Sequence, residues 1–218
     1  MRFIRVWAYN CARYLSDNMK ESHQKRSIYY YGFQILISSI VKTSLLVIIS
    51  LFIGTLLPTL VVLAAFASLR VLAGGYHMDS YGKCAFFSIG MFVLGGVIAK
   101  YTVQYWDLII LCSFSAAALA AGIFVLIRWA PRDNPRRPIT KAEEIRNFRK
   151  LSFIYMCLWI IVNVTLILMK HNIYVISICF GMLFELLTIV PFGYNFFEWL
   201  SGNVDKLNKQ QKFIHNRR

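Results

Sequence analysis

The sequence predicts an all-α membrane protein with about six transmembrane helices and an N-terminal amphipathic helix. Hydrophobic residues make up 58% of the 218-residue chain and charged residues only 16%, whereas soluble globular chains hold about 45–50% apolar and about 25% charged residues. The apolar residues fall in six long runs, and each is near the ~20 residues that cross about 30 Å of hydrocarbon. Nineteen of the 24 Lys and Arg residues lie in three blocks, over 2–26, 128–150 and 206–218. Such blocks are typical of a polytopic membrane protein, so we expect one membrane domain over 1–218.

The first expected element is a helix over residues 1–26. Apolar and basic side chains alternate there at helical spacing, and the apolar set is Phe3, Ile4, Trp7, Ala8, Cys11, Tyr14 and Leu15. We therefore expect a basic amphipathic helix that lies on an anionic membrane surface.

The six apolar runs follow in order, and each is a predicted span. They cover residues 28–50, 52–69, 85–105, 108–129, 151–169 and 172–200. The last run contains Pro191 and Gly193, so we expect it to kink or to end in an interfacial turn.

The basic connections between the spans predict the orientation of the chain. If the N-terminus is cytoplasmic, the segment 70–83, the basic loop 128–150 and the basic tail 201–218 all lie on the cytoplasmic side. The three outer connections are short and hold few charges. This arrangement satisfies the positive-inside rule, so we expect both termini in the cytoplasm.

The loop 128–150 contains three prolines, at positions 131, 135 and 138. Proline disfavours helix both at its own position and at the residue before it, so the first part of the loop is expected to be extended or turn-rich. Thr140 and Glu143 then have the spacing of a capping box, which predicts a helix leading into the fifth span.

The cysteine spacing and the distribution of charge argue against a zinc site, a disulfide framework and a nucleic-acid partner. The five cysteines are scattered without a CxxC pair, so the sequence predicts no zinc site and no disulfide framework. The formal net charge of +14 lies in blocks between apolar runs and not along one face, so we do not expect a nucleic-acid partner.

The segment 70–84 is the candidate for chemistry. A cysteine is nucleophilic as the thiolate, and a nearby imidazole can accept its proton. His77 and Cys84 are seven residues apart, which on one helix is a rise of about 10.5 Å and too far for proton transfer at about 3 Å. About one such His–Cys pair is expected by chance in this composition. The glycines at 74, 75 and 82 favour an interrupted backbone that brings the two side chains together.

The neighbouring residues allow several supporting roles. Asp79 or Ser80 is a candidate cap of the third span, which would place Cys84 near the first turn and its helix dipole. Arg70 is a source of positive potential or a ligand for a substrate carboxylate. The amide groups at Gly74–Gly75 or at the start of the third span are candidates for an oxyanion hole.

Lys42 and Glu185 are ionisable residues deep within predicted spans. Such residues are functional candidates because they are costly in a membrane. The sequence leaves two interpretations open: the two residues pair with each other, or Lys42 extends its amine toward the interface.

Arg70, Gly74, Gly75, His77 and Cys84, in this spacing between the second and third spans, resemble the accessory gene regulator B family of Gram-positive bacteria. The resemblance extends to the basic N-terminal helix, the six spans, the basic central loop and the chain length, and so covers essentially the whole chain.

This resemblance implies a membrane-embedded cysteine endopeptidase of the bacterial cytoplasmic membrane. Such an enzyme removes the C-terminal tail of a small quorum-sensing precursor peptide and promotes closure of the remainder into a thiolactone or lactone autoinducing peptide. By this resemblance Cys84 is the nucleophile, His77 is its general base, and Arg70, Gly74 and Gly75 are supporting residues. No metal or cofactor is implied. The expected partners are a precursor with an amphipathic helix and an acidic tail, anionic lipid, and a second copy of the chain in a homodimer.

Two other classes of function remain open from the sequence. One is a six-helix transporter or peptide exporter without peptidase activity, in which 70–84 is a gating loop. Against it, the spans show no pair of Gly/Pro-broken helices in two related halves. The other is a structural scaffold in which the cysteines only pack.

Overall fold

The computed structural model describes residues 2–19, 23–76, 81–130, 142–193, 195–200 and 202. This part of the chain is helical and contains no β-strand. Its elements are α1 (Arg2–Asn18), α2 (His23–Ile53), α3 (Leu56–Ala73), α4 (Tyr81–Thr102), the short 3₁₀ helix η1 (Val103–Tyr105), α5 (Leu108–Trp129), α6 (Ala142–Leu168) and α7 (Asn172–Ile189). Helices α2 to α7 each contain a stretch that is long and apolar enough to cross a membrane. The predicted all-α class, with six candidate spans after an N-terminal helix, is confirmed.

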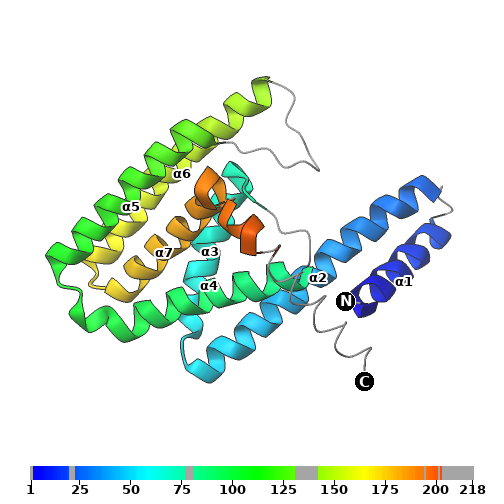
Figure 1. Cartoon of the computed structure of the whole chain (residues 1–218), viewed down its shortest axis with the longest axis horizontal. Coiled ribbons are helices and arrows are strands. Elements are labelled where there is room, and N and C mark those ends of the chain that lie inside the picture. Colours follow the sequence, from blue (N-terminus) through cyan, green and yellow to red (C-terminus); the bar gives the residue numbers. More distant parts are fainter. Residues whose placement is uncertain are drawn as a thin grey trace.

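Helix α7 is the centre of the bundle (Figure 1). It packs against α3, α4, α5 and α6, and a larger share of its apolar stretch is buried than of any other candidate span in the described part of the chain. Helices α5 and α6 lie side by side along one edge, while α2 lies at the opposite side next to α4. The side chains of α7 are therefore well placed to organise residues that come from several helices.

Helix α1 forms a hairpin with the first half of α2, and this hairpin projects from the bundle (Figure 1). Its small apolar residues Ala8 and Ala12 are buried, in keeping with a face that packs on α2. The hairpin is fastened where the two helices join, because Arg26 donates to Ser16 Oγ at 3.2 Å and to Asp17 Oδ1 at 2.9 Å. The predicted N-terminal helix is present but shorter than the expected 1–26: it ends at Asn18, and residues 23–26 already belong to α2. Its exposed aromatic side chains include Phe3, Trp7 and Tyr14.

The break between the first two spans lies at Gly54 and not at residue 51 as predicted. Gly54 has a φ of +77°, and the amides of Gly54 and Thr55 donate to the carbonyls of Leu51 and Ser50 at 3.0 and 2.8 Å. This is the hydrogen-bond pattern of a Schellman cap, which favours glycine at the residue with positive φ. The hydrophobic run alone does not locate the cap, so the predicted boundary was three residues early.

The last apolar run is interrupted as predicted. Helix α7 ends at Ile189, and Val190 is extended with φ −67° and ψ 146°. A residue before proline favours this conformation, and here the proline is Pro191. Helical residues resume at 191–193 and 195–200. The capping residue Thr140 lies outside the described residues, and the expected helix before the fifth span begins at Ala142.

We expect Gly181→Ala to destabilise the bundle by about 1–3 kcal/mol, the usual cost of overpacking a core. A Cβ at Gly181 would lie 2.5 Å from the carbonyl oxygen of Val62 and 2.7 Å from the Cβ of Ala65, so α3 and α7 would have to separate. The unfolding midpoint of the purified protein in detergent measures the effect. Gly90→Ala is the matched control, since a Cβ there meets no atom within 4 Å; an equal midpoint in the two variants would contradict the close packing.

Candidate functional site

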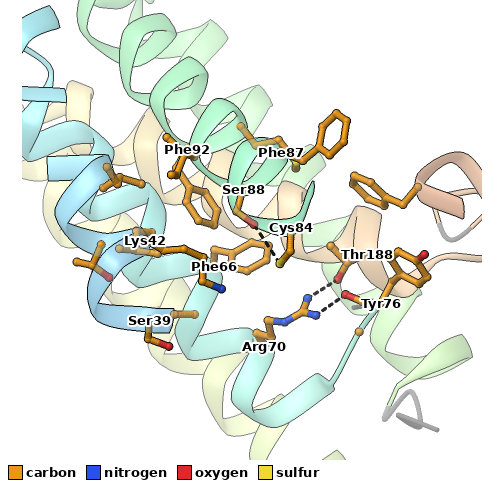
Figure 2. A pocket seen from close by; sticks show the side chains of 18 of the residues that line it. Ser39, Lys42, Phe66, Arg70, Tyr76, Cys84, Phe87, Ser88, Phe92 and Thr188 are labelled. Carbon is orange, nitrogen blue, oxygen red and sulfur yellow. Dashed lines mark hydrogen bonds between the residues drawn. The ribbon is translucent and has the colours of Figure 1, made fainter. Parts of the chain in front are cut away.

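Cys84 lines a cavity of about 560 Å³ between α2, α3 and α4 (Figure 2). Thr188 of α7 and Phe197 line the same cavity. The cysteine is the fourth residue of α4, so it lies in the first turn as expected. Its side chain is half-buried, and its Sγ lies 3.9 Å from Ser88 Oγ. The cavity walls are mainly apolar, formed by Leu46, Leu63, Phe66, Ile89 and Phe92 among others. The thiol thus lies at a mainly apolar cavity that is large enough for part of a peptide.

The backbone turns away from α3 at the two glycines that the sequence singled out. Gly74 has a φ of +75° and Gly75 a φ of +141°, and side-chain-bearing residues adopt such values only with strain. Gly75 also has no room for a side chain. A Cβ there would collide with Thr188 Oγ1 and would lie 2.9 Å from Arg70 Nη1. Glycine is therefore required at 75 both for conformation and for packing.

Arg70 holds this turn against α7. Its Nη1 donates to Glu185 Oε2 and to Thr188 Oγ1, each at 3.0 Å, and its Nη2 donates to the carbonyl oxygen of Tyr76 (Figure 2). The guanidinium also lies 5.5 Å from the centre of the Phe66 ring, within the range of a cation–π contact. Arg70 therefore links α3, α7 and the chain that leaves the glycine turn.

Glu185 is the acidic partner of Arg70, which corrects the suggested pairing with Lys42. Glu185 is completely buried on α7, and α7 packs directly on α3, the helix that carries Arg70. A buried carboxylate requires a charged or hydrogen-bonding partner. The sequence did not predict this pair, because Glu185 lies deep within its own predicted span and 115 residues from Arg70.

Tyr76 is the last described residue before His77, and it is fixed at three points. Its amide donates to the carbonyl of Thr188 at 3.0 Å, its carbonyl accepts from Arg70, and its ring stacks on Phe197 with centroids 6.1 Å apart. The backbone that leads to residue 77 is therefore anchored to α7. His77, Asp79 and Ser80 lie outside the described residues, so the His77–Cys84 contact stays a prediction.

Lys42 lines the same cavity from α2 (Figure 2). Its amine lies 5.6 Å from the centre of the Tyr81 ring, and the Tyr81 hydroxyl donates to the carbonyl of Ser38 at 2.9 Å. The lysine thus points into the cavity beside the start of α4. Among the described residues, no three His, Cys, Asp or Glu side chains are grouped so that they could hold a metal ion.

Comparison with known proteins identifies the family. The family model described as accessory gene regulator B matches residues 8–189, which is most of the chain. The chain belongs to the accessory gene regulator B family. An AgrB-like protein of Clostridium acetobutylicum is 30% identical over 165 residues, which are 75% of this chain and 74% of the relative. An AgrB-like protein of Clostridium perfringens is 21% identical over 203 residues, covering 88% of this chain and 94% of the relative. No solved structure matches the chain.

Membership in the accessory gene regulator B family supports a role in agr-type quorum-sensing peptide processing. Together with the six apolar helices it indicates a multi-pass membrane protein. The family match includes both α3 and the start of α4, and all residues that line the cavity except Phe197.

Proposed function

We propose that this chain is a cysteine endopeptidase that cleaves the C-terminal tail from a quorum-sensing precursor peptide and promotes cyclisation of the remainder. The main support is the position of Cys84, which lies in the first turn of α4 and lines a mainly apolar cavity of about 560 Å³. Ligand cavities of about 300–1,000 Å³ are typical of binding sites. The anchored turn before His77 is the second support, because catalysis requires the base to be held in place.

The first proposed step forms an acyl-enzyme. His77 accepts the proton of the Cys84 thiol, and the thiolate attacks the scissile carbonyl carbon. The new carbon–sulfur bond forms as the carbon–nitrogen bond breaks, and His77 returns the proton to the departing amine. The products are the free tail and a thioester between the precursor and Cys84.

The second step exchanges one acyl bond for another. A thiol within the bound peptide attacks the thioester carbonyl, forms a thiolactone, and releases Cys84 as the thiol. Because one thioester replaces another, the closure needs no external energy source; a peptide hydroxyl in the same role would give a lactone. Water competes at this stage, and an apolar cavity that excludes water protects the intermediate.

The geometry of the glycine turn suggests a role for the residues that support the catalytic pair. Arg70, Gly74 and Gly75 have the role of holding the backbone before His77. The precursor is expected to carry an amphipathic helix and an acidic tail, which the basic cytoplasmic blocks would attract. Anionic lipid is expected to bind the same blocks, with both termini in the cytoplasm. We also propose that two copies of the chain form a homodimer.

We expect Cys84→Ala to abolish both tail release and cyclisation. The variant is co-expressed with a short peptide precursor encoded beside the gene, and the peptides are identified by intact-mass and fragment mass spectrometry. Wild type should yield the tail and a cyclic peptide that is one water lighter than the linear fragment. Cys112→Ala is the control, since Cys112 is exposed on α5 and does not line the cavity. Equal cleavage by Cys84→Ala would refute the proposal, and passage of uncleaved peptide across proteoliposomes without Cys84 would favour an exporter.

A further inference from the structure

The charges around the cavity are unbalanced. Arg70 is neutralised by Glu185 at 3.0 Å, so its charge is already compensated. Lys42 is the other cation that lines the cavity. No carboxylate lies within ion-pair distance of its amine, and no Asp or Glu lines the cavity, among the residues that the structure describes. Within the described part of the chain, the cavity beside Cys84 therefore holds a positive charge without a matching anion.

A lysine in this place is costly unless an anion accompanies it. Lys42 lies within the α2 stretch that is apolar enough to span a membrane, where ionisable residues tend to mark binding or transport sites. Its side chain is half-buried and points into the cavity between α2 and α4 (Figure 2). The Tyr81 ring offers a weak contact at 5.6 Å, which supplies no negative charge.

The rest of the cavity limits which anion fits. Phe66 and Phe92 meet edge to face with centroids 4.9 Å apart, and with Leu46 and Leu63 they form an apolar wall. A small hydrated ion would leave this wall unfilled. A peptide segment that combines a carboxylate with bulky apolar side chains complements both the charge and the surface.

We infer that Lys42 binds a carboxylate side chain of the peptide substrate, while the apolar wall holds neighbouring hydrophobic residues of the same segment. Lys42 is thus a specificity-determining residue for peptides with an Asp or Glu near the scissile bond. The inference rests on the proposed function, because it assigns the cavity beside Cys84 to the peptide substrate. It predicts a preference for acidic over amide side chains that disappears when Lys42 is neutralised.

The first test uses two small alkylating reagents that differ in charge and does not need the precursor. Iodoacetate carries a carboxylate and iodoacetamide does not, and both alkylate thiolates. In membranes that contain the full chain, peptide mapping measures the alkylation rate of Cys84 with each reagent. An effect of Lys42 on the ionisation of the thiol changes both rates equally and cancels in their ratio, whereas attraction of a carboxylate raises only the iodoacetate rate.

We expect Lys42→Met to lower the iodoacetate-to-iodoacetamide ratio at Cys84 about tenfold, the order of effect of one unit charge a few ångströms away in a partly desolvated site. Lys42→Arg, which keeps the charge, should retain the wild-type ratio. Lys150→Met is the matched control, since Lys150 is exposed on α6 and does not line the cavity. An unchanged ratio in Lys42→Met would overturn the inference. If Lys42→Met does not reach the membrane, Lys42→Gln replaces it.

The second test couples Lys42 to the substrate. Each Asp and Glu of the cleaved precursor is replaced in turn by Asn or Gln, and KM and kcat are measured with wild type and with Lys42→Met. At one position of the precursor, replacing the carboxylate by the amide should raise the KM of wild type about tenfold and leave the KM of Lys42→Met unchanged. A uniform fall in kcat with every peptide would show that Lys42 acts on the thiol alone. If no peptide is cleaved at all, the proposed function fails, and the alkylation ratio still decides the role of Lys42.

Discussion

Arg70→Met is expected to destabilise the protein by about 3–5 kcal/mol, the usual cost of removing one partner of a buried ion pair. Glu185 is completely buried and bonds to Arg70 through Oε2, and its other oxygen has no hydrogen-bond partner among the described residues. Without Arg70 the carboxyl group loses its cation, and the Tyr76 carbonyl loses its donor. The unfolding midpoint in detergent and the rate of precursor cleavage should both fall. Arg128→Met is the control for the unfolding midpoint, since Arg128 is an exposed residue in the last turn of α5.

A double variant separates the structural role of this pair from its role at the site. Replacing a buried ion pair by apolar residues often restores stability, so Arg70→Met combined with Glu185→Leu should recover much of the midpoint. Cleavage should remain low, because the donor to Tyr76 is still absent. Recovery of cleavage together with stability would show that the pair serves only the fold.

The hydropathy pattern was sufficient to predict the architecture. Apolar runs report how many segments can cross a membrane, and the basic blocks distinguish the two sides. The exact helix ends were less accessible, because a cap depends on local hydrogen bonds. Gly54 illustrates this: it follows the end of α2 with a φ of +77°, and its backbone amide donates to the carbonyl of Leu51 at 3.0 Å, three residues after the boundary that the hydrophobic runs predict.

The candidate site was only partly accessible from the sequence. The spacing of Arg70, the two glycines and Cys84 indicated a segment whose residues line one cavity in the structure, since polar and glycine residues are unusual between two spans. The partner of Arg70 was not accessible in the same way, because Glu185 is 115 residues away and periodicity within a helix does not report which helices touch. Thr188 was missed for the same reason, and nothing in its sequence neighbourhood distinguishes it from a packing residue.

Gly75→Ala is expected to destabilise the turn and to reduce cleavage more than the loss of folded protein explains. The φ of +141° at Gly75 costs roughly 1–3 kcal/mol for a residue with a side chain, and the new Cβ collides with Thr188 Oγ1. Thr188 would have to move, and it accepts from Arg70 through Oγ1 and from the Tyr76 amide through its carbonyl. Both contacts of Thr188, which help to hold the backbone before His77, would then weaken together.

The control for Gly75→Ala is Gly82→Ala. The sequence predicted that Gly82 helps to interrupt the backbone, but Gly82 lies in the first turn of α4, which is continuous from Tyr81. A Cβ at Gly82 meets no atom within 4 Å, and alanine favours helix over glycine, so this variant should keep both its unfolding midpoint and its cleavage. Adding Thr188→Ala to Gly75→Ala removes the colliding oxygen and leaves the backbone strain, so stability should recover in part. The measurements are the detergent unfolding midpoint and cleavage per folded protein. Normal cleavage by Gly75→Ala would mean that the proposed chemistry does not depend on the turn that Arg70 and α7 hold in place.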